Sequence, residues 1–214
     1  MKSDMKLYQS NGSPNSRRVR IFLTEKAICV MQVPVDLGAK EQFSDAYSKI
    51  NPRQVVPTLL LENGTAIGEV PAIQRYLDEA FPEQSLLGRS PEEKALVQMW
   101  DRRMELEGFA VVMETVRNKA AGLAGRAIAG PHRYEQIPAL VERGRIRIAD
   151  FYADLEARLT DNPFIAGENY SVAGVTALVT IDFATKALEL GIPPPSAATL
   201  SWYARLAIRP SFSA

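Results

Sequence analysis

The sequence predicts an α/β domain followed by an all-helical domain, and two observations lead to that prediction. Over the first eighty or so residues, the spacing of apolar residues alternates between strand and helix periods, whereas the remainder keeps the helical period. The stretch between them, PEQSLLGRSPEE, contains the proline, glycine and serine residues typical of a linker. We therefore predict a first domain over residues 1–82, a linker over 83–91 and a helical domain over 92–214.

In the first domain, a strand over residues 5–9, a helix over 14–27 and a strand over 30–35 predict a parallel βαβ unit. A short helical stretch at 43–50 follows. Asn63-Gly64 is the signature of a type I′ hairpin, which would pair residues 58–61 with 65–67 in antiparallel fashion. The next helix begins near Glu69, and we expect it to bury Ile73, Leu77 and Ala80.

The second domain opens at Pro91, since proline is tolerated at the first helical position and the acidic residues that follow suit a helix N-terminus. The long helix has an apolar stripe that we interpret as core or subunit interface. Its members are Leu96, Met99, Leu106, Ala110 and Met113. Helical patterns also cover residues 134–159 and 201–209, and the nearly all-apolar residues 171–190 predict a buried central helix.

Composition excludes several classes of function. The chain has 214 residues with 25 basic and 25 acidic side chains, so no net charge attracts nucleic acid or an anionic membrane. No apolar run suits a membrane span, and no export leader is recognisable. With Cys29 and His132 as the only cysteine and histidine, a transition-metal site or an internal disulfide is not expected. We expect a cytoplasmic protein without a cofactor or bound metal.

Two neighbouring features suggest a site for a short peptide with a carboxylate. A cis bond between Val56 and Pro57 would leave the Val56 backbone free to pair with an extended peptide. The helix start at Glu69-Val70 offers N–H groups and a positive dipole end to an anion. Each feature also has an ordinary structural interpretation, as an edge strand and as a favourable helix terminus.

Together these segments resemble the cytosolic glutathione transferases, nearest to theta-like and related bacterial members. The matching stretches are SPNSRRVRIFLTEKAI, NPRQVVPTLLLENGTAIGE, AIQRYLDEAFPE and PFIAGENYSVAGVTALVTIDF, which span nearly the whole chain. The resemblance implies a thioredoxin-like N-terminal domain, an all-helical C-terminal domain and a homodimer. It also implies glutathione as thiol cosubstrate, with a small hydrophobic electrophile as the second substrate and detoxification as the setting.

The resemblance also implies roles for individual residues. Val56 would pair with the cysteinyl backbone of glutathione, and Pro57 would be the cis proline. Glu69 would bind the γ-glutamyl end. Gln42 and Gln54 would lie near the glycyl carboxylate.

Ser13 matches the theta-like serine that favours the thiolate form of glutathione, the form that attacks. Ser13-Pro14 is equally the pattern of an ordinary helix N-cap. Asn15, Ser16 and helix N-terminal amides remain alternatives for the activating role. Arg117 and Asn118 on the long helix are further candidates to face the sulfur, although a solvated helix face is the more ordinary interpretation.

Two positions depart from the family pattern. Val70 replaces a serine or threonine, so one hydrogen bond to the γ-glutamyl carboxylate is lost and affinity would fall about ten- to a hundredfold. Gly174 replaces the aspartate of a capping box at the buried helix, where we expect Ser171 still to cap. Because of Val70, a non-catalytic binding or regulatory module of the same fold is the alternative to an enzyme. A thiol-disulfide or peroxide reductase is a third possibility, disfavoured because the first loop has no cysteine.

Overall fold

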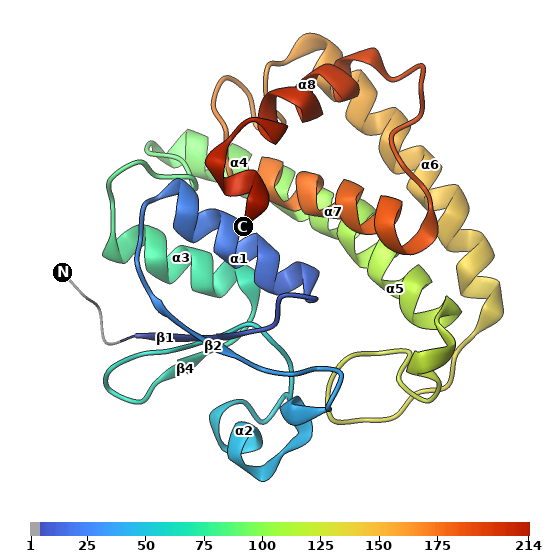
Figure 1. Cartoon of the computed structure of the whole chain (residues 1–214). Helices are drawn as coiled ribbons and strands as arrows, with labels where there is room; N and C mark the ends of the chain where they lie inside the picture. Colours follow the sequence, from blue (N-terminus) through green and yellow to red (C-terminus); the bar gives the residue numbers. More distant parts are fainter. Residues whose placement is uncertain (1–4) are drawn as a thin grey trace. The chain divides into compact units, whose positions relative to one another are not determined.

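The computed structural model describes residues 5–214, which divide into two compact units. The first consists of the chain up to Ser85 together with Ala129–His132 and Ser213–Ala214. The second consists of Leu86–Ile128 and Arg133–Phe212. The first is α/β and the second is helical, so the predicted fold class is confirmed (Figure 1). The sequence did not indicate that residues 129–132 would group with the first unit.

The first unit is built on a four-stranded sheet of order β2-β1-β3-β4. As predicted, β1 pairs in parallel with β2, and the two are joined through a helix. Helices α1 and α3 lie on one side of the sheet and α2 on the other (Figure 1). The elements are β1 (Lys6–Gln9), α1 (Pro14–Glu25), β2 (Met31–Pro34), a 3₁₀ turn (Glu41–Phe43), α2 (Asp45–Ile50), β3 (Thr58–Leu60), β4 (Ala66–Ile67) and α3 (Val70–Ala80). Ile73 and Leu77 are fully buried, whereas Ala80 is exposed, contrary to expectation.

The antiparallel hairpin of β3 and β4 forms as predicted, but its turn is not of type I′. The N–H of Gly64 donates to the carbonyl of Leu61 (3.0 Å), and the N–H of Leu61 donates to the carbonyl of Thr65 (2.9 Å). Only Gly64 has a positive φ, of 83°, whereas a type I′ turn needs two such residues. The side chain of Asn63 instead accepts the N–H of Thr65 (3.0 Å). This hydrogen bond forms a local turn in which Asn63 does not need a positive φ.

A buried ion pair fixes the end of the first unit. The Nζ of Lys26 donates to Asp78 Oδ1 (2.7 Å) and to the carbonyl of Glu83 (3.0 Å). The hydroxyl of Ser85 donates to the other carboxylate oxygen of Asp78 (2.6 Å). Because both charges are shielded from solvent and hydrogen-bonded, the pair holds the start of the linker against α1 and α3.

The second unit packs its helices around α7, whose residues from Val172 to Ile181 are all buried, so the predicted central helix is confirmed. The elements are α4 (Pro91–Arg103), a π-helical segment η2 (Met104–Phe109), α5 (Ala110–Lys119), a 3₁₀ turn (Ala121–Leu123), α6 (Pro138–Asp161), α7 (Val172–Leu188), α8 (Ala197–Ala207) and a last 3₁₀ turn (Pro210–Ser213). Within residues 5–214, no helix has the length and apolarity needed to cross a membrane.

The expected cap of α7 is absent. The Oγ of Ser171 is buried without a hydrogen-bond partner, so the prediction that it caps the helix is wrong. A Cβ on Gly174 would lie 2.7 Å from the ring of Tyr170. Glycine at this position therefore leaves room for the tyrosine ring, which an aspartate would displace.

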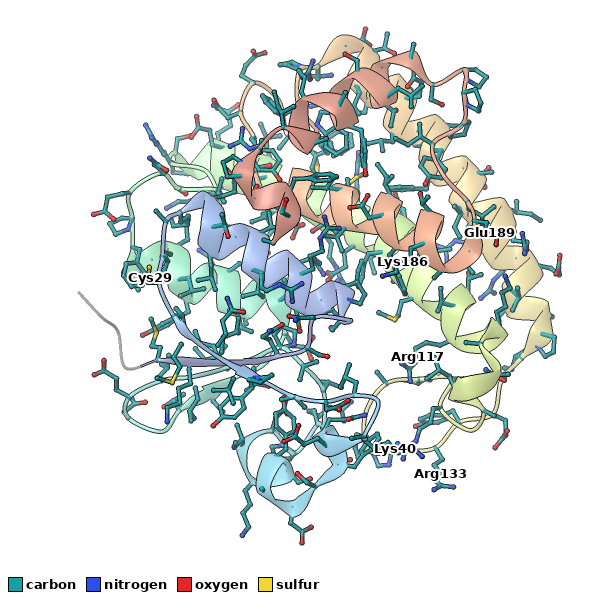
Figure 2. The ribbon with its side chains drawn as sticks, viewed as in Figure 1. Cys29, Lys40, Arg117, Arg133, Lys186 and Glu189 are labelled. Carbon is teal, nitrogen blue, oxygen red and sulfur yellow. The ribbon has the colours of Figure 1, made fainter. Side chains whose placement is uncertain are left out.

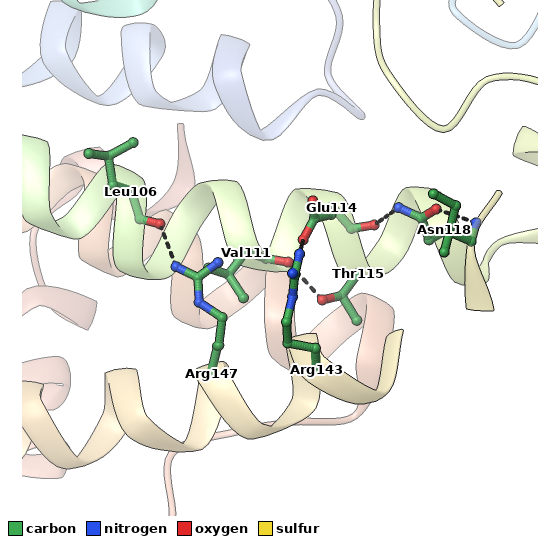
Figure 3. A network of polar contacts seen from close by, with 8 residues as sticks. Leu106, Val111, Glu114, Thr115, Asn118, Arg143 and Arg147 are labelled. Carbon is green, nitrogen blue, oxygen red and sulfur yellow. Dashed lines mark hydrogen bonds and ion pairs between the residues drawn. The ribbon is translucent and has the colours of Figure 1, made fainter. Parts of the chain in front are cut away.

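Helices α5 and α6 approach each other closely (Figure 3). Arg143 of α6 pairs with Glu114 of α5 (3.3 Å), and Arg147 donates to the carbonyl of Leu106 in η2 (3.3 Å). Next to the first of these contacts, a Cβ on Gly144 would lie only 1.9 Å from Thr115 Oγ1. The close approach therefore depends on a glycine at position 144.

Candidate functional site

A hydrogen-bond network fixes the loop that carries Val56. The carbonyl of Val55 accepts from the hydroxyl of Tyr47 (2.6 Å) and from Asn51 Nδ2 (3.0 Å). Thr58 Oγ1 lies within hydrogen-bond distance of the same two side chains, at 3.0 and 2.8 Å. Burial raises the pKa of Tyr47, although the hydrogen bonds act against that shift. Sequence reasoning missed this network, even though a loop asparagine followed by Pro52 was a visible turn signal.

The bond between Val56 and Pro57 is cis, as predicted. No hydrogen bond joins the N–H or C=O of Val56 to any other residue in the range 5–214. The Val56 side chain packs with Val35 and Tyr47, and the residue as a whole is only 8% exposed. The backbone pair is therefore unsatisfied by the described residues, and packing of the side chain holds it in place.

The start of α3 offers fewer donors than the sequence suggested. Pro71 has no N–H, and the N–H groups of Ala72 and Ile73 already donate to the carbonyl of Glu69 (3.1 and 3.0 Å). The N–H of Val70 has no partner among the described residues. Glu69 is exposed and has a φ of 62°, which turns the chain into the helix. The Val70 side chain is 4% exposed, so its methyl groups belong to the core.

Ser13 is the N-cap of α1, where its Oγ accepts the N–H of Ser16 at 3.2 Å. Its hydroxyl proton is not used by that bond and can be donated elsewhere. Ser16 has an Oγ that accepts the N–H of Ser10 (3.2 Å), but its side chain is fully buried, and burial keeps its hydroxyl away from a ligand. Asn15 is partly exposed, and its Oδ1 accepts from Arg18 at 3.4 Å. Ser13 and Asn15 thus remain as side-chain candidates.

The two glutamines differ in their contacts. Gln54 has a φ of 56°, and its Nε2 donates to Ser48 Oγ at 2.9 Å, so that one amide proton already has a partner. Gln42 lies in the 3₁₀ turn before α2, and its Oε1 is buried without a hydrogen-bond partner. Their roles toward a ligand remain predictions.

Contacts within the first unit connect several of these residues. The amide nitrogen of Asn51 that holds Val55 lies 3.9 Å from where a Cβ of Gly68 would be, which places the Val56 loop beside the residues leading into Glu69. Tyr8, near the end of the strand that leads to Ser13, packs against the cluster that contains Val56. This arrangement can hold a short extended peptide and orient a group at a helix start.

The second-unit candidates have structural contacts of their own. Asn118 Nδ2 donates to the carbonyl of Glu114 (2.9 Å), and its Oδ1 accepts the N–H of Ile137 (2.8 Å). Arg117 donates to the carbonyl of Arg126 (2.5 Å). Among residues 5–214, no three histidine, cysteine, aspartate or glutamate side chains are grouped so as to hold a metal.

Comparisons with known proteins agree with this geometry. Residues 7–85 match the family model described as glutathione S-transferase, N-terminal domain. The crystal structure of a glutathione S-transferase domain-containing protein from Marinobacter aquaeolei is 34% identical, with a TM-score of 0.88 over 96% of this chain and 98% of that one. Glutathione S-transferase 2 of Saccharomyces cerevisiae is 29% identical over 99% of this chain and 89% of that protein. The disulfide-bond oxidoreductase YfcG of Escherichia coli is 24% identical over 93% of this chain and 88% of that protein.

Proposed function

Because the chain belongs to the glutathione S-transferase family, we propose that it is a glutathione transferase that conjugates the glutathione thiolate to a small hydrophobic electrophile. The observation that carries the proposal is the backbone N–H and C=O of Val56, which have no hydrogen-bond partner among residues 5–214. Its N–H and C=O would pair with the cysteinyl residue of glutathione in the manner of an added strand.

The remaining first-unit residues would orient the ends of the peptide. The γ-glutamyl carboxylate would accept the unused N–H of Val70, and the exposed Glu69 would pair with the γ-glutamyl ammonium. Gln42 and Gln54 would lie toward the glycyl carboxylate. In the family pattern, a serine or threonine hydroxyl and a main-chain N–H both donate to the γ-glutamyl carboxylate. Here only the main-chain N–H is present, so we expect weaker binding of glutathione.

Ser13 would assist the chemical step. Its free hydroxyl proton would hydrogen-bond to the sulfur and stabilise the thiolate, whose proton passes to solvent. The thiolate then forms a C–S bond at the electrophilic carbon, and the leaving group departs with the electron pair. The all-helical unit would supply the apolar surface that binds the electrophile.

We further propose that the enzyme is a homodimer. The exposed large apolar side chains on the long helix include Leu96, Met99 and Leu106, each 39–46% exposed. Such a stripe on a helix surface is typical of an interface between subunits.

Two parallel assays test the proposal. Calorimetric titration measures glutathione binding, and absorbance follows conjugation of chlorodinitrobenzene. We expect binding together with conjugation. Binding without conjugation of any of several electrophiles would favour the non-catalytic module. Reduction of a hydroxyethyl disulfide by glutathione in the absence of conjugation would favour an oxidoreductase such as its relative YfcG.

A further inference from the structure

The segment that follows α5 has an unbalanced charge. Residues 115–134 contain three arginines, one lysine and the only histidine, without a single aspartate or glutamate. The whole chain, by contrast, has equal numbers of acidic and basic side chains. The segment is flanked by Glu114 and Glu135, and between these two glutamates it carries a net positive charge.

The fold brings the basic residues of the second unit together. The Nη2 of Arg117 donates to the carbonyl of Arg126, and Arg126 forms an isolated parallel bridge with Tyr134. Arg133 therefore lies one residue from that bridge. Figure 2 shows Arg133 on the loop that extends beyond the end of the helix bearing Arg117.

Arg117 is a half-buried cation without an acidic partner. Its Nε is shielded from solvent and has no acceptor, and no carboxylate among residues 5–214 forms an ion pair with it. Glu114, one turn earlier on the same helix, is paired with Arg143. Burial lowers the pKa of the Arg117 guanidinium, and the positive charge of Arg126 lowers it further.

Two other arginines of this unit are compensated. Arg102 pairs with Glu105 (2.8 Å), and Arg158 lies over the ring of Trp100 while donating to a carbonyl. Arg117 has a single carbonyl contact in spite of its burial and its cationic neighbour. An unneutralised, partly desolvated guanidinium is unfavourable on its own and binds carboxylates strongly.

We propose that Arg117 binds the carboxylate of a small organic acid at the end of α5. The proposal does not rest on the transferase function. The segment that follows Arg117 favours an apolar ligand body over inorganic phosphate, since its apolar residues include Ala120, Ala121, Leu123 and Ala124.

A matched pair of ligands tests the site without any need for activity. Para-chloro-meta-nitrobenzoate and the corresponding benzamide have the same ring and differ in one substituent, an anionic carboxylate or a neutral carboxamide of similar size. Without glutathione, calorimetry should show the benzoate binding at least about tenfold more tightly than the benzamide. Arg117→Met should remove that preference, Arg117→Lys should keep part of it, and Lys119→Met, on the same turn but exposed, should preserve it.

Equal binding of benzoate and benzamide to the wild type would overturn the proposal, and so would an unchanged preference in a folded Arg117→Met. Inorganic phosphate that displaces the benzoate with similar affinity would overturn the assignment to an organic carboxylate. If Arg117→Met does not fold, loss of the preference in Arg117→Gln decides the question.

Discussion

Replacing Val70 tests whether the start of α3 is a ligand site or only a helix terminus. Val70 is the first residue of the helix, its N–H has no partner in the part of the chain that the structure describes, and its side chain is 4% exposed. Val70→Ser places a hydroxyl where a γ-glutamyl carboxylate would meet the helix N-terminus. Val70→Ala is the matched control, because it loses the same methyl groups without gaining the oxygen.

Because Val70 is buried, its substitution is expected to lower the free energy of unfolding. From the pattern alone, serine near a helix start would leave stability unchanged. With both methyl groups buried, Val70→Ala should lose about 2 kcal/mol of unfolding free energy. Val70→Ser should lose about 2–4 kcal/mol without ligand, since its hydroxyl is then buried without an assured partner.

Although Val70→Ser should be less stable, it should bind glutathione more tightly than Val70→Ala. A hydrogen bond from the new hydroxyl to a carboxylate should tighten glutathione binding about five- to thirtyfold relative to Val70→Ala, after the cost of ordering the side chain. Calorimetry measures the affinities, and thermal melts with and without glutathione should show a larger ligand-induced shift for serine than for alanine. If the folded serine and alanine forms bind glutathione equally, no carboxylate lies at this helix start and the reasoning is wrong.

Three other changes test the site, the fold and the assembly. Ser13→Ala should lower kcat about ten- to a hundredfold and raise the pKa of the bound glutathione thiol, while the affinity for glutathione stays nearly unchanged. If the thiol titrates as in the wild type, Ser13 is not the group that activates it. Gly144→Ala should lower the free energy of unfolding by at least about 1–3 kcal/mol in a urea titration, because its Cβ would lie 1.9 Å from Thr115 Oγ1. Gly122→Ala is the control, with no atom within 4 Å of the added Cβ, and equal losses would contradict the packing argument. Leu96→Glu should convert the proposed dimer to monomers in sedimentation velocity; a variant that stays dimeric would place the interface elsewhere.

The parts of the site that could be predicted are those set by local backbone chemistry. A valine before a proline at the start of a strand indicated a cis bond and an unpaired residue, and the structure has a cis bond there. The contacts that hold this loop could not be predicted, because Tyr47, Asn51 and Thr58 meet only after α2 folds back toward β3. The turn at Gly64 shows the same limit on a smaller scale, since the asparagine used its side chain rather than a left-handed backbone.

The long helix carries its apolar stripe on an exposed face. The stripe was interpreted as core or subunit interface, and the exposure of Leu96 and Leu106 leaves the interface interpretation and removes the core interpretation. The buried face combines apolar residues such as Val97 with Asp101 and Gly108. Because an aspartate and a glycine interrupt its apolar residues, an apolar period identifies this face poorly.

Each unusual residue on that face has a partner from another helix. Asp101 accepts the hydroxyl of Thr176 in α7 (2.6 Å), and Gly108 leaves room for the ring of Phe151, which would lie 2.5 Å from an added Cβ. Asn118 accepts the N–H of Ile137. Because polar and small side chains are accommodated only by specific partners, this face requires one arrangement of the neighbouring helices. The apolar stripe beside it remains available for contact with another subunit, so one long helix can present a specific inner face and an apolar outer one.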